Sequence, residues 1–208
     1  MSIQVVDKDK LIESLHRFVY ARVLVIGDII LDEYIWGSVS RISPEAPVPV
    51  VEVRKQSQML GGAGNVVSNL VSLGAKPMLC AVVGEDQAGS RILTKIKEMG
   101  VEANAIFVDR QRPTSIKTRV IAHNQQVVRF DKESKAPISR EILNRILERA
   151  SHSIDGIDVI LVSDYGKGVV SRGLIEGLQA LAGGRQIPIA VDPKIGNFSC
   201  YRGVDILT

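Results

Sequence analysis

The stretch Arg22-Val-Leu-Val-Ile-Gly-Asp28 is apolar from its second residue until it ends on an aspartate. A strand without polar alternation is typical of a parallel sheet that is covered on both faces. Two later runs, Val159–Ser163 and Ile187–Val191, have the same character and are followed by Asp164 and Asp192. Parallel strands end at one rim, where ligands of open α/β sheets bind, so the sequence predicts a polar site there. Each aspartate taken alone is equally well explained as a turn or cap residue.

Length and composition limit the class of protein. The chain has 208 residues, of which 45% are hydrophobic and 24% charged, with a formal net charge of +3. These values are ordinary for a globular protein with one sizeable core. Lysine and arginine are scattered among acids, which argues against a nucleic-acid partner, and the apolar runs are too short to span a membrane. Because Cys80 and Cys200 are isolated and the N-terminus resembles no secretion signal, we expect a cytoplasmic protein.

Helices alternate with strands along most of the chain, which predicts a mostly parallel α/β fold. Apolar spacing and capping residues predict helices at Lys8–Tyr20, Asn65–Leu73, Ser90–Met99, after Ser139 and at Ser171–Leu181. Further strands are predicted at Pro77–Val83 and Val204–Leu207.

Two half-polar segments interrupt this alternation. Residues 35–58 contain three prolines and an alternating strand pattern, and residues 114–131 read as an antiparallel hairpin. We expect strands at about residues 34–58 and 114–131 to pair in a small separate sheet that forms a lid over the rim. Lys117 and Arg119 lie on the polar face of the predicted hairpin, where cations are often solvated but where a lid over an anionic substrate would need them.

The strongest local motif is Gly61-Gly62-Ala63-Gly64-Asn65, directly before a predicted helix. Glycines let a ligand approach the backbone, and free N–H groups at a helix start attract oxygen-rich or anionic groups. The motif is not a dinucleotide fingerprint, because a third glycine would have to stand at Val67. A tight entry turn without a ligand is the alternative explanation.

Asp28 and Asp32 form a pair of carboxylates just after the first strand. They are four residues apart, so in a helical or turn-like segment they would face the same way. Two carboxylates suit sugar hydroxyls, since their oxygens accept strong hydrogen bonds. A capped turn explains the pair equally well.

Two acid–lysine pairs follow the later strands. Asp164 and Lys167 lie in the turn Ser163-Asp-Tyr-Gly-Lys-Gly168, and Asp192 and Lys194 lie one strand further on. Lysines beside such a rim suit phosphate groups, and the acids could help to hold Mg²⁺ through water. A surface ion pair between neighbours is the alternative.

Together these stretches resemble the ribokinase-like (PfkB-type) family of sugar kinases. The matching segments are Val25–Asp32, Ser40–Val50, Leu60–Val66, Thr118–Val120, Ser163–Gly168 and Val191–Lys194. Within that family, Ser43-Pro-Glu-Ala-Pro-Val-Pro49 and Ser163–Gly168 are most similar to the kinases that phosphorylate D-glycero-D-manno-heptose 7-phosphate at C1.

The resemblance implies a three-layer α/β/α domain with an inserted β lid, of which these residues are a part. It also implies ATP and Mg²⁺ as cofactors, a phosphosugar substrate, a homodimer formed through the lid, and a role in ADP-heptose and lipopolysaccharide synthesis. Carried over residue by residue, the resemblance implies that sugar is bound by Asp28, Asp32, Gly61, Gly62, Asn65 and, from the lid, Arg119. It implies phosphate contacts for Lys167 and Lys194. Asp164 and Asp192 would support these lysines, and Asp192 is a candidate metal ligand through water.

One departure from the family pattern concerns catalysis. In the family, a Gly-Ala-Gly-Asp motif supplies an anion hole and the aspartate base. This motif does not occur in the 208 residues. The Asn-x-x-Glu segment and the adenylyltransferase domain that is often fused to such kinases do not occur in them either. We therefore expect the base to lie beyond Thr208 and these residues alone to give little turnover. Another sugar or phosphosugar kinase of this fold, and a non-catalytic sugar-binding or dimerising module, remain alternatives.

Overall fold

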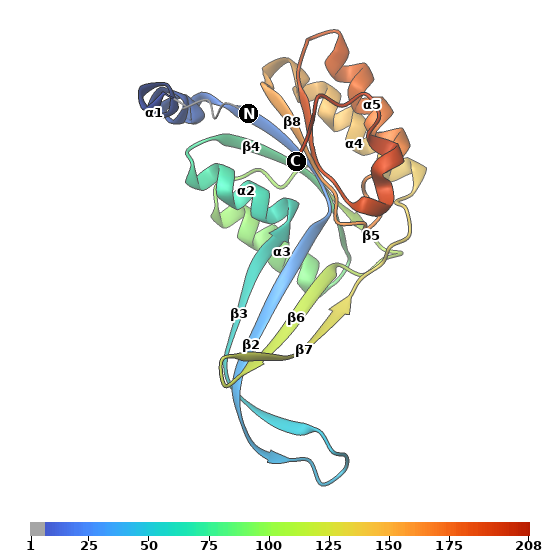
Figure 1. Ribbon diagram of the computed structural model, residues 1–208. Helices are drawn as coiled ribbons and strands as arrows, with labels where there is room; N and C mark the ends of the chain where they lie inside the picture. Colours follow the sequence, from blue (N-terminus) through green and yellow to red (C-terminus); the bar gives the residue numbers. More distant parts are fainter. Residues whose placement is uncertain (1–6) are drawn as a thin grey trace.

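The computed structural model describes residues 7–208 and arranges their strands in two sheets (Figure 1). In the larger sheet, six strands lie in the order β10-β9-β8-β1-β4-β5, and each neighbouring pair is parallel. The predicted α/β fold is therefore confirmed. The strands of this sheet are β1 Arg22–Gly27, β4 Lys76–Gly84, β5 Ile106–Asp109, β8 Val159–Ser163, β9 Ile189–Asp192 and β10 Ile206–Leu207.

Helices cover both faces of the larger sheet (Figure 1). Leu24 and Ile26 of β1 point into the apolar core under α4 and α5, whereas Val23 and Val25 point into the core under α2 and α3. Each of these side chains is at most 2% exposed, and burying one contributes about 1.5–3 kcal/mol. This two-sided burial is why the strand shows no polar alternation. The helices are α2 Ala63–Ser72, α3 Gln87–Glu98, α4 Arg140–Ser153 and α5 Arg172–Gly183.

The N-terminal helix α1, Lys8–Arg17, has no buried residue and continues as a 3-10 turn, η1 Phe18–Tyr20. Two further 3-10 segments, η2 Ile154–Gly156 and η3 Ile195–Tyr201, follow α4 and β9. Within residues 7–208, the helices are too short or too polar to cross a membrane.

The smaller sheet has the strand order β3-β2-β6-β7, with β2 parallel to β6 and antiparallel to β3. The predicted hairpin is confirmed, because β6 and β7 pair antiparallel. The expectation of a helical or turn-like segment after Asp28 is wrong, since β2 begins at Ile29 and the chain passes straight from one sheet into the other. The strands are β2 Ile29–Ile42, β3 Pro49–Gly62, β6 Ser115–Ala122 and β7 Gln125–Lys132.

Asp86 joins the two sheets at the start of α3. Its carboxylate accepts hydrogen bonds from the N–H of Gly89 at 2.9 Å and from the N–H of Thr114, just before β6, at 3.0 Å. The hydroxyl of buried Thr114 in turn accepts a hydrogen bond from the N–H of Gly84 at 2.9 Å. Burial raises the pKa of Asp86, but hydrogen bonds from Thr114 and Gly89 and the charge of Lys132 outweigh it, so the pKa lies below 3.8.

Replacing Asp86 separates its charge from its capping role. Asp86→Ala should lower the free energy of unfolding by about 1–2 kcal/mol, since a helix cap and a contact to Thr114 are lost. Asp86→Asn retains the cap, because asparagine caps helices as well as aspartate, but removes the charge.

A group with a lowered folded-state pKa stabilises the fold above its unfolded-state pKa and loses that contribution as the pH falls through the lowered value. Urea denaturation should therefore show wild type more stable than Asp86→Asn at neutral pH, and the difference should vanish well below pH 3.8. A difference that is constant across this range would contradict the account.

Candidate functional site

The polar site lies where β9, β8 and β1 end side by side. The register pairs Gly27 with Ser163 and Ser163 with Asp192, so Asp28, Asp164 and Asp192 share one rim as predicted. Their access to ligand differs, because Asp28 is 2% and Asp164 3% exposed whereas Asp192 is open to solvent.

The carboxylate of Asp28 is occupied by the loop that follows β8. Its Oδ2 accepts hydrogen bonds from the N–H groups of Tyr165 and Lys167, each at 2.9 Å, and its Oδ1 from that of Val169 at 3.1 Å. Burial raises the pKa of Asp28 more than these hydrogen bonds lower it, and the charge of Asp164 raises it further. This geometry gives Asp28 the task of shaping the loop, and its contact with sugar hydroxyls stays a prediction.

Asp164 is likewise engaged by the protein. Its Oδ1 accepts a hydrogen bond from the N–H of Gly166 at 2.7 Å, and its Oδ2 accepts from the Tyr201 hydroxyl at 2.6 Å and the Asn197 amide at 2.7 Å. Burial and the hydrogen bond to Asp164 raise the pKa of Tyr201. Asp164 thus holds η3 against the rim with both of its oxygens bound by the protein, and its supporting position beside Lys167 stays a prediction. Asn197 and Tyr201 carried no sequence signal for this role.

Asp32, unlike Asp28 and Asp164, is partly exposed. Its Oδ1 forms an ion pair with Nη1 of Arg119 on β6 at 2.6 Å, and the carboxylate side chain is 19% exposed. The guanidinium of Arg119 also lies 5.2 Å from the ring centroid of Tyr34. The hydrogen bond to Asp32 raises the pKa of Arg119. A Cβ at Gly61 would come within 2.1 Å of Asp32 Oδ2, so only glycine leaves room for this side chain.

The glycine motif connects β3 directly to α2 beside Asp32. Gly62 has φ +57°, and a Cβ there would lie 2.2 Å from the carbonyl oxygen of Asp28, which accepts a hydrogen bond from the N–H of Ala63 at 2.9 Å. The motif therefore does serve as a tight entry turn. No side chain caps α2, and Asn65 is exposed in its first turn, so backbone donors remain available at this end.

Two lysines reach the rim from neighbouring loops. Lys167 Nζ lies 2.5 Å from Glu133 Oε2, and the two side chains are 11% and 15% exposed. Lys194 is exposed, and its stem packs beside the position that a Cβ of Gly166 would occupy, at 3.4 Å from Cγ. Glu133 could not be recognised from the sequence, since it lies 34 residues before its partner in a loop of charged residues.

Tyr165 lies among the charged groups of the rim. Lys117 Nζ is 5.4 Å from its ring centroid. Burial, followed by the negative charges of Asp192 and Asp32, raises the pKa of Tyr165. The phenol therefore remains a hydrogen-bond donor. Tyr165 was missed as a site residue although it lies inside a motif that drew notice for its acid and lysine.

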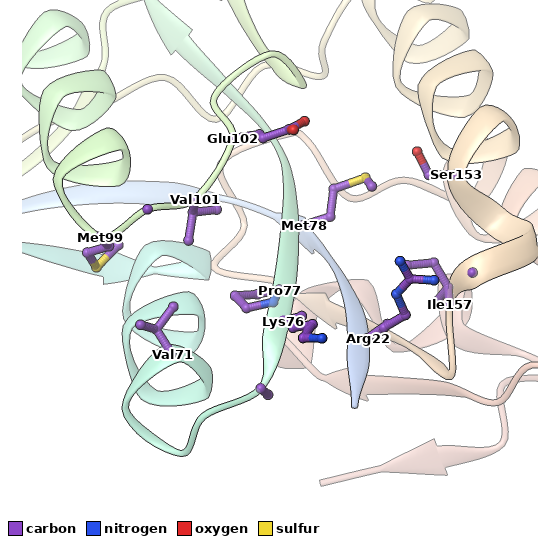
Figure 2. Close-up of a pocket in the computed structure, with 13 residues that line it drawn as sticks. Arg22, Val71, Lys76, Pro77, Met78, Met99, Val101, Glu102, Ser153 and Ile157 are labelled. Atoms are coloured by element: carbon purple, nitrogen blue, oxygen red, sulfur yellow. The ribbon is translucent and has the colours of Figure 1, made fainter. Parts of the chain in front are cut away.

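A separate pocket of about 550 Å³ opens at the other end of the strands (Figure 2). Arg22 and Lys76, the first residues of β1 and β4, line it together with apolar side chains such as Val71 and Met78. Ligands of open α/β sheets bind outside the carboxyl ends of the strands, so we place the functional site at the aspartate rim.

The sequence pattern of the pfkB family carbohydrate kinases matches residues 21–195. The chain belongs to this family. The matched part runs from the start of β1 to the residue after Lys194, so it includes every residue predicted for the site.

Individual relatives agree with this pfkB assignment. The chain is 50% identical over 200 residues to "Bifunctional protein HldE" of Pelobacter propionicus and 46% identical to the protein of that name of Trichlorobacter lovleyi; each match covers 96% of this chain and 41% of the relative. The chain thus spans about two fifths of the length of these relatives.

Solved structures show that the pfkB chain has the ribokinase-like fold. Ribokinase from Giardia lamblia has a TM-score of 0.67 at 14% identity, over 90% of this chain and 61% of that chain. Arabidopsis thaliana ribokinase, complexed with ribose and ATP, has a TM-score of 0.63 at 14% identity, over 90% and 59%.

The loop of this pfkB-family chain should loosen in Asp28→Asn. The asparagine side chain has one oxygen instead of two. Either the N–H of Val169 or the N–H groups of Tyr165 and Lys167 therefore lose their acceptor, which should lower the free energy of unfolding by about 1–3 kcal/mol. Hydrogen exchange read at the amides of Tyr165, Lys167 and Val169 should become faster. Asp32→Asn, the same change four residues away, is the control and should leave these amides protected. Equal protection in both variants would overturn the role given to Asp28.

Proposed function

We propose that the chain is the substrate-binding portion of an ATP-dependent kinase that converts D-glycero-D-manno-heptose 7-phosphate to the 1,7-bisphosphate, for ADP-heptose and lipopolysaccharide-core synthesis in the cytoplasm. The observation that carries the binding site is the accessible Asp32 carboxylate, fixed by Arg119 and facing Gly61. The preference for heptose is supported by 46–50% identity to the HldE relatives.

Asp32 would bind hydroxyl groups of the sugar. Its ion pair with Arg119 uses Oδ1, and Oδ2 faces the glycine motif. Hydroxyls that donate to a carboxylate form strong, charge-assisted hydrogen bonds. The uncapped start of α2, together with Asn65, supplies donors for sugar oxygens. Donors and acceptors thus converge on one side of the rim, as binding of a polyol requires.

Lys167 and Lys194 would face phosphate groups of the substrate and of ATP. Mg²⁺ is usually held by one or two carboxylates together with substrate phosphates, and exposed Asp192, two residues before Lys194, fits a contact through water. When bound with ATP, the ion neutralises phosphate charge during transfer. We assign the base that deprotonates the acceptor hydroxyl to the part of the longer protein that this chain does not span.

The small sheet would also form the homodimer interface. All eight residues of the edge strand β7 are exposed, and Val127, Val128 and Phe130 place apolar side chains there. An exposed edge strand with apolar residues favours pairing with another chain.

Calorimetry on this chain tests the proposal. Heptose 7-phosphate should bind, and Asp32→Asn should weaken binding about tenfold or more, since a hydrogen bond to a charged group contributes about 1.5–3 kcal/mol. Asp109→Asn, at the end of β5 on the same rim, is the matched control and should bind as wild type does. A protein that also contains the remaining sequence of its relatives should transfer phosphate from ATP to heptose 7-phosphate, and phosphorus NMR should show the new phosphate at C1.

Two results would count against the assignment. Equal affinity for heptose 7-phosphate, fructose 6-phosphate and ribose would favour another sugar kinase of this family. Sugar binding without any ATP-dependent transfer by the longer protein would favour a binding module.

A further inference from the structure

Two lysines from different parts of the fold lie near Tyr165, Lys117 through space and Lys167 along the chain. Lys117 lies on β6, opposite Asp32 in the strand register, and its Nζ is 5.4 Å from the Tyr165 ring centroid. Lys167 follows Tyr165 by two residues in the loop that Asp28 shapes. Burial lowers the pKa of Lys117, and the positive charge of Lys167 lowers it further; the negative charges of Asp32 and Asp131 raise it by less, so the pKa stays lowered.

Only one of the two ammonium groups has a close counter-ion. Lys167 Nζ lies 2.5 Å from Glu133 Oε2, which holds this lysine in place. For Lys117, in contrast, residues 7–208 offer no carboxylate oxygen within 4.0 Å. Its register partners on β2 and β7 are acids that are already paired, Asp32 with Arg119 at 2.6 Å and Asp131 with Arg129 at 3.0 Å. A half-buried ammonium group beside another cation is unfavourable unless an anion completes the arrangement.

The missing counter-ion of Lys117 favours a phosphate monoester as the ligand. Its several charged oxygens can accept hydrogen bonds from two ammonium groups at once, and lysine binds phosphate as a compact point charge. A neutral hydroxyl group would leave the charge of Lys117 without a close counter-ion. Because Asp32 and Lys117 are neighbours across β2 and β6, a sugar held at Asp32 can extend a phosphate toward Lys117. Lys194, exposed on the loop after β9, remains for phosphates that arrive from solvent.

We propose that Lys117 and Lys167 together bind the phosphate that the sugar already carries, and that the Tyr165 ring lies beneath this phosphate. This inference rests on the proposed function and deepens it, because it makes recognition of a phosphorylated sugar a property of the junction between the two sheets. Lys117 is the decisive residue, since Glu133 already neutralises Lys167 before any ligand arrives.

The test compares Lys117→Met with Lys55→Met in the 208-residue chain. The control lysine lies on the same sheet and its Nζ is also 5.4 Å from an aromatic centroid, that of Trp36. Calorimetry with heptose 7-phosphate should show binding weakened about tenfold or more in Lys117→Met and unchanged in Lys55→Met. Unphosphorylated heptose should bind both variants as it binds wild type. Lys117→Arg should restore most of the loss, which a purely structural role of lysine would not predict.

Other outcomes overturn the inference or separate it from the proposed function. An equal loss for heptose and heptose 7-phosphate in Lys117→Met, or a wild type that binds both sugars equally, would overturn the phosphate subsite while leaving a sugar kinase intact. If wild type binds neither sugar, the proposed function fails, and titration with inorganic phosphate decides the subsite. In that titration, phosphate should shift the amide NMR signals around Tyr165 in wild type but not in Lys117→Met, which would support the phosphate subsite. Unshifted amide signals in wild type would overturn the subsite.

Discussion

A buried carboxylate costs free energy unless hydrogen bonds replace the water that it has lost, and at Asp28 three backbone N–H groups do so. The donors belong to alternate residues of one loop, Tyr165, Lys167 and Val169, so a single side chain determines the path of that segment. The path brings Lys167 to Glu133 and places the Tyr165 ring under Lys117. The positions of Lys167 and of the Tyr165 ring at the rim therefore follow from Asp28.

The two sheets contribute different parts of the site. The larger sheet is held by two apolar cores and presents the loops after β8 and β9. The smaller sheet supplies Asp32, Lys117 and Arg119 from adjacent strands, and Asp86 anchors its strand β6 to the start of α3. A ligand bound at the rim would contact both sheets, so its affinity depends on how they are joined.

Much of the fold could be predicted because its signals are local. The uninterrupted apolar run at β1, the glycine that ends α2 at Gly74 with φ +84°, and the alternation at β6 each report on their own segment. The roles of the aspartates could not be predicted in this way. Asp28 binds amides 137 or more residues away, and Asp164 binds Tyr201 across 37 residues. An aspartate after a strand has the same sequence context whether a loop or a ligand satisfies it. Only the three-dimensional structure shows that Asp28 and Asp164 are buried and bound by the protein, whereas Asp32 is partly exposed.

We propose that Asp28 and Asp164 build the rim, whereas Asp32, Lys117 and Lys167 contact the substrate. A crystal structure of the chain with D-glycero-D-manno-heptose 7-phosphate tests it most directly. Sugar hydroxyls should lie on the Asp32 carboxylate and the phosphate between Lys117 and Lys167, and the Asp28 carboxylate should still be bound to its three amides. A sugar hydroxyl on Asp28, or a phosphate bound away from Lys117, would contradict this proposal.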